Sequence, residues 1–241
     1  MKTRITHSLR VLTIILLGLF IIMGLIFITS CGGEDEGGVL LTSLTFADPA
    51  LANAVNTSGA TYVHELTTLH CDGLGITDLS GIENLTSLTR LTATDNNISD
   101  VSPLASLTSL TSMDLSINNI SDVSALASLI NLTELDLNWN NISDVSALAS
   151  LTNLMGLFLD GSNISDVSAL ASLTNLIGLS LDYNNISDVS ALASLTSLTT
   201  LRLGVNNIID VSSLASLTSL TELYLNNNNI TTSVASLVTL I

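Results

Sequence analysis

The chain has 241 residues with a formal net charge of −16; 47% of its residues are hydrophobic, but only 3% are aromatic. Only five Lys and Arg residues accompany 21 acidic residues, which argues against a nucleic-acid partner because phosphate neutralisation needs Lys and Arg. The scarcity of aromatic residues argues against one large core and favours many small, similar layers.

The N-terminus has the pattern of a targeting or anchoring segment. The basic stretch MKTRITHSLR is followed by an apolar run over residues 11–30 and then by the glycine-rich acidic stretch CGGEDEGG. Residues 1–30 are therefore predicted to be a signal peptide or, alternatively, an uncleaved membrane anchor, because the apolar run is long enough to span a bilayer. Residues 31–44 are predicted to form a short flexible tether.

The junction Ile28-Thr29-Ser30-Cys31 resembles the lipobox of bacterial lipoproteins. This resemblance implies that Cys31 is lipidated and becomes the new N-terminus. Several acyl chains on one cysteine would hold the protein firmly, whereas a single chain binds a membrane only marginally. The protein is thus expected to be exported and anchored at the bacterial cell envelope, in either the plasma or the outer membrane.

Residues 45–62 are predicted to form an N-terminal helical cap. Within them, the stretch FADPALANAV contains Asp48 followed by Pro49. Asp is a good N-cap residue and Pro is favoured at the first helical position, so a helix is expected to begin there. Such a helix would cover the apolar edge of the first repeat.

The rest of the chain, residues 63–241, is predicted to form eight units of 22 residues. These units begin at residues 63, 85, 107, 129, 151, 173, 195 and 217, and the stretch ISDVSALASL recurs four times among them. In unit 4 (129–150), Leu135 and Leu137 alternate with the polar residues Glu134, Asp136 and Asn138. This alternation predicts one short strand per unit, and equal unit lengths predict that the strands stack in parallel.

Two polar positions recur in the units. Position 12 is predicted to turn inward and bond backbone groups of its own and the adjacent unit; it is Asn96, Asn118, Asn140, Asn184, Asn206 and Asn228. Position 16 is predicted to cap a short 3₁₀ turn rather than to bind metal; it is Asp78, Asp100, Asp122, Asp144, Asp166, Asp188 and Asp210. Leu74 and Ser162 replace Asn at position 12, which predicts a different first turn and a break in the Asn ladder.

These units resemble the leucine-rich repeats of the bacterial internalin-like class, whose 22-residue consensus includes N-x-I-x-D-I-x-P-L. Pro103 keeps the proline of that consensus, whereas Ala or Ser replaces it in most other units, and residues 46–55 resemble the N-terminal cap of the class. The resemblance implies an α/β fold: a right-handed leucine-rich repeat solenoid with a parallel β-sheet on its concave face, short 3₁₀ turns on its convex face and an N-terminal helical cap.

In this architecture, the outward side chains at positions 5, 6, 8, 10 and 11 of each unit form the concave face. Trp139, Phe158 and Tyr183 are predicted to lie close together there, with Tyr224 further along. The core does not need these aromatic residues because Leu fills the inward positions. Exposed aromatic groups of this kind are typical binding anchors; the alternative is that they are tolerated surface substitutions.

The concave face also carries charge. Asp114 and Asp136 are neighbours at position 8, and Asp160 and Asp182 are neighbours at position 10. At a strand spacing of about 5 Å, each pair disfavours ionisation of both carboxyl groups. A basic protein patch, a weak Ca²⁺ site and a plain solvated acidic surface all remain open. Both arginines of the repeats map to the same face; they are Arg90 and Arg202.

No catalytic site, resident metal or cofactor is expected. Beyond residue 30 the chain has only two histidines, His64 and His70, and no Lys. His70 and Cys71 are neighbours on a predicted strand, so their side chains point to opposite sides and cannot act together. Cys71 is expected to be a buried, unreactive thiol.

Two functional hypotheses follow. The first is a lipid-anchored cell-surface module that recognises a protein partner through the concave face. The alternative is a structural envelope protein that contacts glycan or associates with other copies of itself through an uncapped C-terminal edge. A hydrolytic enzyme is a distant third.

Overall fold

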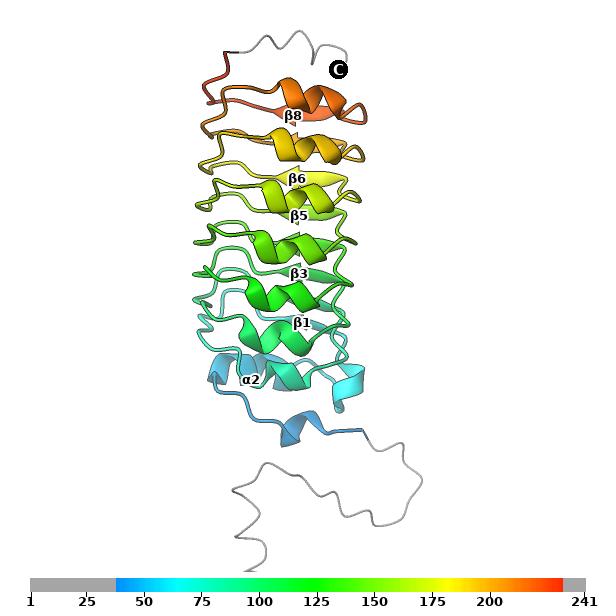
Figure 1. The fold of residues 1–241 in the computed structure, drawn as a ribbon. Coiled ribbons are helices and arrows are strands. Elements are labelled where there is room, and N and C mark those ends of the chain that lie inside the picture. The colour runs from blue at the N-terminus through cyan, green and yellow to red at the C-terminus, as the bar shows by residue number, and fades with distance from the viewer. Residues whose placement is uncertain (1–37, 232–241) are drawn as a thin grey trace, which may run out of the picture. The chain divides into compact units, whose positions relative to one another are not determined.

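The computed structural model describes residues 38–231, in which eight strands of three residues each form one parallel sheet in chain order (Figure 1). Each unit supplies one strand, so the predicted solenoid is confirmed. The strands are β1 (Thr68–His70), β2 (Arg90–Thr92), β3 (Ser112–Asp114), β4 (Glu134–Asp136), β5 (Gly156–Phe158), β6 (Gly178–Ser180), β7 (Thr200–Arg202) and β8 (Glu222–Tyr224).

The core is a stack of leucine layers behind this sheet. In β4, Leu135 is fully buried between exposed Glu134 and half-buried Asp136. Leu135 pairs across the sheet with Leu157 of β5, which is also fully buried. Because every unit has the same length, each inward side chain packs on its equivalent in the next unit.

Short 3₁₀ helices cover the opposite side of the solenoid and lie in front of the strands in Figure 1. They are η3 (Ile82–Asn84), η4 (Ser102–Ser106), η5 (Ser124–Ser128), η6 (Ser146–Ser150), η7 (Ser168–Ser172), η8 (Ser190–Ser194) and η9 (Ser212–Ser216). Asp122 illustrates how they begin, since its Oδ1 accepts the backbone N–H of Ser124 at 2.8 Å. The predicted capping role is confirmed, although Asp122 lies one residue before the N-cap residue, Val123.

The predicted Asn ladder is also confirmed. Asn118 Oδ1 accepts the N–H of Ile98, and its Nδ2 donates to the carbonyls of Ala93 and Leu115 at 2.9 and 3.0 Å. One buried amide therefore pairs backbone groups of two consecutive units, which would otherwise be buried without partners.

The ladder is interrupted where the sequence predicted. Ser162 is buried, and its hydroxyl oxygen has no hydrogen-bond partner. The first turn differs as well: Leu74 is exposed between Gly73 and Gly75, which both have positive φ. Asn96 of the next unit compensates, since its Oδ1 accepts the N–H of Leu74.

The N-terminal cap, 45–62, contains the helix α2 (Pro49–Asn56), and the 3₁₀ helices η1 (Leu41–Ser43) and η2 (Val63–Glu65) precede and follow the cap in the chain. Asp48 is the N-cap of α2 as predicted, because its Oδ1 accepts the N–H of Ala50 at 2.8 Å. Its other oxygen accepts the N–H of Thr77 at 2.9 Å, which ties the cap to the first unit.

Part of the segment assigned from the sequence to the tether, 31–44, is packed against the cap. Leu41 is buried, and its N–H donates to the carbonyl of Thr61 at 3.0 Å. Leu40 forms an antiparallel bridge with Tyr62. Burial of the Leu41 side chain favours this packing, whereas Val39 and Leu40 remain exposed.

Several sequence predictions lie outside the described residues. These are the signal peptide or membrane anchor (1–30), the lipidation site Cys31 and the C-terminal edge proposed for self-association. Within residues 38–231, no helix is both long enough and apolar enough to cross a membrane.

Candidate functional site

The concave face carries apolar side chains on a strained turn. At position 11, Ile117, Trp139, Tyr183 and Val205 all have left-handed backbone conformations, with φ between 55° and 57°. This region is unfavourable for bulky and β-branched residues. Trp139 and Tyr183 are nevertheless 52% and 53% exposed, so burial does not compensate for the strain. The repeat imposes this conformation at position 11 of all eight units, so the feature that suggests function is the presence of bulky exposed side chains there instead of Gly or Asn.

Trp139 and Tyr183 are in contact, as predicted, although they belong to units 4 and 6. Their ring centroids are 5.6 Å apart and the rings are tilted by 41°. Unit 5 contributes Gly161 between them, and a Cβ there would lie 2.2 Å from Cε3 of the indole. Gly161 therefore provides the space in which Trp139 reaches across one unit. The sequence analysis missed this role, which a glycine between two aromatic residues at the same repeat position could have indicated.

Units 5 and 6 depart from the repeat at two further positions. Position 5 is Thr in the other six units, but here it is Met155 and Ile177, which are 47% and 40% exposed. Position 6 is glycine in the same two units, as Gly156 and Gly178. Phe158 is 38% exposed, and its ring leans towards Gly156, whose Cβ, if present, would lie 3.4 Å from Cε2. Met155 and Ile177 were not predicted as site residues, although their departure from the repeated Thr at position 5 could have indicated them.

The exposed apolar side chains on the concave face of units 4 to 6 are here called the central patch. They are Trp139, Met155, Phe158, Ile177 and Tyr183. The predicted site residue Tyr224 lies on β8, three strands from Phe158 in the position-8 column. The guanidinium of Arg202 lies over the Tyr224 ring, 4.5 Å from its centroid. The structure therefore groups Trp139 with Tyr183 and groups Arg202 with Tyr224.

Asp136 is the most perturbed carboxylate of this face. It pairs in the sheet with Asp114 on one side and with Phe158 on the other. Burial and, to a smaller extent, the charges of Asp114 and Asp160 together raise the pKa of Asp136 to about 6, although the hydrogen bond from Asn138 opposes the shift. The sequence analysis anticipated the repulsion between the paired carboxylates, but burial is the larger cause.

Asp160 and Asp182 also have a structural role that the sequence did not indicate. Asp160 Oδ1 accepts the N–H of Asp182 at 2.8 Å and the hydroxyl of Ser180 at 2.6 Å. Asp182 Oδ1 likewise accepts the N–H of Gly204. Each carboxylate thus ties its unit to the next. Burial raises the pKa of Asp182, and the nearby charge of Asp160 acts in the same direction.

The charges on the concave face are unevenly distributed. Units 3 to 6 carry five carboxylates and no Lys or Arg at the concave positions; the five are Asp114, Glu134, Asp136, Asp160 and Asp182. The two arginines lie on either side of this region, Arg90 in unit 2 and Arg202 in unit 7. Across residues 38–231, no group of three or more His, Cys, Asp or Glu side chains is placed to hold a metal ion.

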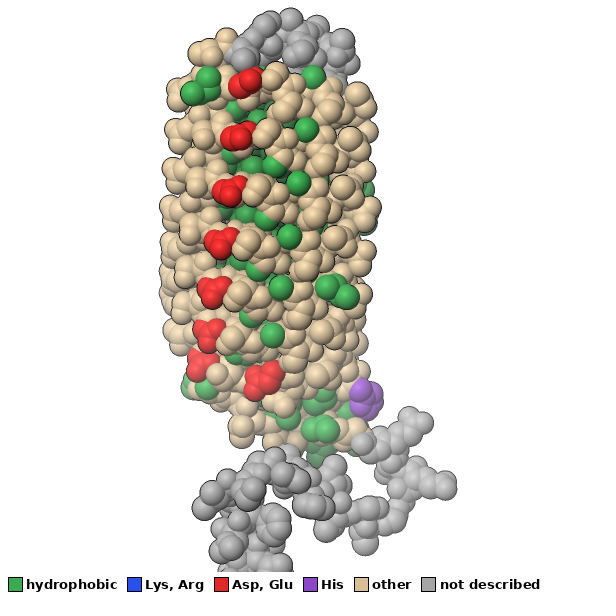
Figure 2. All heavy atoms as spheres, viewed as in Figure 1, with side chains coloured by type: hydrophobic (Ala, Val, Ile, Leu, Met, Phe, Trp, Pro, Cys, Tyr) green, Lys and Arg blue, Asp and Glu red, His purple; other side chains and the backbone are tan. Residues whose placement is uncertain are grey.

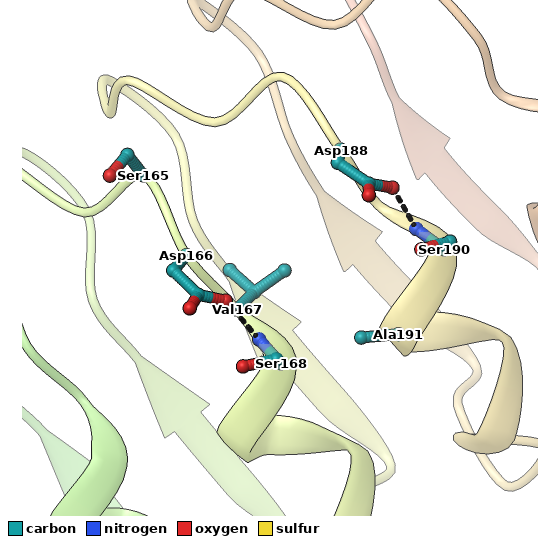
Figure 3. Close-up of a pocket in the computed structure, with 7 residues that line it drawn as sticks. All are labelled: Ser165, Asp166, Val167, Ser168, Asp188, Ser190 and Ala191. Atoms are coloured by element: carbon teal, nitrogen blue, oxygen red, sulfur yellow. Dashed lines mark hydrogen bonds between the residues drawn. The ribbon is translucent and has the colours of Figure 1, made fainter.

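The convex face carries a second column of carboxylates, seen in Figure 2. Its members are the Asp residues at position 16, which begin the 3₁₀ turns. Figure 3 shows two of them lining a cavity between units 5 and 6, where Asp166 accepts the N–H of Ser168 and Asp188 that of Ser190. These hydrogen bonds lower the pKa of Asp166 and of Asp188. The convex carboxylates are thus explained by turn formation.

Cys71 is buried, as the sequence predicted. Its Sγ lies 3.2 Å from the carbonyl oxygen of Thr92, to which it donates. Burial, with a smaller effect from the charge of Asp72, raises the pKa of Cys71 to about 12. The thiolate required of a nucleophile is therefore strongly disfavoured.

Comparisons with known proteins agree with the repeat. Residues 86–128, 108–150, 174–216 and 196–238 match a family model described as leucine-rich repeats in two copies. The structure is similar to that of an internalin C2 from Listeria monocytogenes, with a TM-score of 0.79 and 40% sequence identity over 87% of this chain and 96% of that one. The comparison with curated proteins found no match.

Two further Listeria monocytogenes structures are similar. An internalin, InlF, has a TM-score of 0.59 and 32% identity over 86% of this chain and 77% of that one. The functional domain of InlJ has a TM-score of 0.60 and 23% identity over 85% of this chain and 56% of that one, a likeness that concerns the fold alone.

Proposed function

The chain belongs to the leucine-rich repeat proteins as an internalin-like member, and from this membership we propose that it is a lipid-anchored module that binds a protein partner at the bacterial cell envelope. The fold supports protein–protein recognition in general. The finer proposal is that recognition uses the concave face and is centred on the central patch.

The central patch is the observation that carries this proposal. Its five side chains are exposed, and Trp139 and Tyr183 occupy strained backbone positions where glycine or Asn would be tolerated better. Grouped aromatic and Met side chains are enriched in the buried centres of protein interfaces. The surrounding acidic residues would form the polar rim of such an interface.

The experiment is a capture assay with the full-length chain in detergent. Replacement of Trp139, Phe158 and Tyr183 by Ala is expected to abolish capture of the partner from host or envelope extracts, because each exposed anchor loses its contact area. A control replaces Ile130 and Ile209, which are at least as exposed as the three aromatic residues but lie off the concave face, by Ala. Unchanged capture by the triple variant, or equal losses by both variants, would refute recognition through the concave face.

The anchor is proposed from the sequence. The apolar run before Cys31 and the glycine-rich acidic stretch after it support lipidation of that thiol. In a bacterial host grown with radioactive palmitate, the full-length chain is expected to incorporate label and the Cys31→Ser variant is not. Absence of label from the unmodified chain would contradict the proposal.

A further inference from the structure

The central patch is flanked by carboxylates. Asp136 pairs directly with Phe158 across the sheet, and Trp139 follows three residues later in the same unit. Asp182 immediately precedes Tyr183. Phe158 therefore has a carboxylate beside it in register and Tyr183 has one beside it in sequence, while the backbone N–H of Trp139 donates to the carbonyl of Asp160.

The charge of Arg202, in unit 7, lowers the pKa of Asp182, but no cation within residues 38–231 acts on the pKa of Asp136. Units 3 to 6 carry no Lys or Arg on the concave face, and Arg202 of unit 7 lies over the ring of Tyr224. Asp136 is half-buried with Asp114 and Asp160 near it, so its negative charge is poorly solvated and unfavourably placed in the free protein. A partner that brings positive charge would remove part of this cost on binding.

The chemistry of the patch distinguishes between classes of partner. An acidic or neutral surface would desolvate the carboxylates without providing a counter-charge. A neutral glycan would stack on Trp139 and Tyr183 and could donate hydroxyl hydrogen bonds to Asp136, but it would bring no positive charge to it. A Lys or Arg side chain can pair with a carboxylate and also lie over an aromatic ring, while adjacent apolar residues contact Met155 and Ile177.

We propose that the central patch binds a basic segment of a protein, in which Lys or Arg side chains pair with Asp114 and Asp136 and neighbouring aliphatic or aromatic side chains cover Phe158 and Trp139. This proposal rests on the proposed function and specifies the chemistry of the partner. Complementary charge on the two surfaces would also accelerate their association.

The test is selection of a phage-displayed random 12-residue peptide library on the immobilised full-length chain in detergent. Selected peptides are expected to be enriched in Lys and Arg next to aliphatic or aromatic residues. Their affinity for the unmodified chain is expected to fall as salt is raised, because partly exposed ion pairs are screened. Selection of neutral or acidic peptides, the absence of selection above the library background, or affinity independent of salt would overturn the proposal.

The chain offers a matched pair of variants. Asp114→Asn with Asp136→Asn removes two charges from the concave face of units 3 and 4, whereas Asp122→Asn with Asp144→Asn removes two from the convex face of the same units. Asn keeps an oxygen that can accept the existing hydrogen bonds. The concave pair is expected to raise the Kd of the selected peptides by about tenfold or more, and the convex pair by less than about twofold. Equal effects would overturn the proposal.

Failure of this inference can be distinguished from failure of the proposed function. If the alanine variants of Trp139, Phe158 and Tyr183 lose the captured partner but the concave Asn pair retains it, the concave face binds a partner that is not basic. If neither set changes capture, the concave face is not the recognition surface.

Discussion

At the scale of single residues, carboxyl groups on the two faces have opposite electrostatic roles. On the convex face, the N–H and hydroxyl of Ser124 hydrogen-bond to Asp122 and lower its pKa. On the concave face, burial raises the pKa of Asp136 to about 6. Ionised Asp122 therefore contributes stability above its unfolded-state pKa, and this contribution is lost as the pH falls through its lowered folded-state pKa. Ionised Asp136 lowers stability above pH 6, and that cost disappears as the pH falls from about 6 towards 4.

The first prediction follows from the opposite effects of ionised Asp122 and ionised Asp136 on stability. Asp136→Asn is expected to raise the melting temperature at pH 7.5, whereas Asp122→Asn is expected to lower it, because the first removes an unfavourable charge and the second a favourable one. The effect of Asp136→Asn is expected to shrink as the pH falls from about 6 to 4, and that of Asp122→Asn as the pH falls below about 4, because each carboxyl group then becomes protonated. Thermal unfolding followed by circular dichroism at pH 7.5 and at a pH below about 4 checks this. Changes of the melting temperature of the same sign in the two variants at pH 7.5 would contradict it.

The second prediction concerns the interrupted ladder at Ser162. Ser162→Asn is expected to raise the free energy of unfolding by about 1 kcal/mol. The longer amide side chain can reach backbone groups equivalent to those that Asn184 bonds one unit further along the chain. The reverse change, Asn140→Ser, is the control and is expected to lower it by a similar amount. Urea unfolding measures both values. A destabilised Ser162→Asn variant would show that the turn has adapted to the smaller side chain.

At the scale of elements, the position-11 turn determines how side chains reach the concave face. Gly73 and Gly161 occupy equivalent turns with φ of 65° and 64°. A Cβ at Gly73 would approach only Asp95, at 4.0 Å, whereas a Cβ at Gly161 would overlap the indole of Trp139. A substitution at Gly73 therefore tests only the left-handed backbone of the turn, whereas a substitution at Gly161 also removes the space that Trp139 occupies.

The third prediction uses this difference. Gly73→Ala and Gly161→Ala are both expected to lower stability by about 1–2 kcal/mol, since both place Ala in a left-handed conformation. Only Gly161→Ala is expected to displace Trp139 from Tyr183 and so change the near-ultraviolet circular dichroism and the fluorescence of the chain's single tryptophan. An unchanged tryptophan signal in Gly161→Ala would contradict the assigned role of that glycine.

Most elements of this fold are predictable from sequence because each physical cause recurs at fixed spacing. The strand alternation around Leu135 and the turn acceptor Asp122 return every 22 residues, so their agreement across units outweighs the weak signal of any one unit. The features that could not be predicted from the sequence each occur in only one place and so have no repeated pattern. They are the packing of Leu41 on the cap and the space that Gly161 leaves for Trp139. The backbone hydrogen bonds of Asp160 and Asp182 were missed because they depend on exact distances between neighbouring units.

At the scale of the whole molecule, stability arises between neighbouring units, so a local change is expected to remain local. Asp48 connects the cap to the first unit through Ala50 and Thr77. The fourth prediction is that Asp48→Ala lowers stability by about 1 kcal/mol and raises amide hydrogen exchange in units 1 and 2 but not in units 6 and 7. Uniformly faster exchange throughout the solenoid would show instead that the array unfolds as one cooperative body.

Hydroxyl-radical footprinting of the full-length chain, with and without its captured protein, tests most directly which face of the solenoid binds the partner. Trp, Tyr, Phe and Met side chains report this reaction well, and the central patch is composed largely of them. The account predicts that bound partner protects Trp139, Met155, Phe158 and Tyr183 while Tyr62 of the cap keeps its reactivity. Oxidation of the central patch at the same rate in the complex as in the free protein would contradict it.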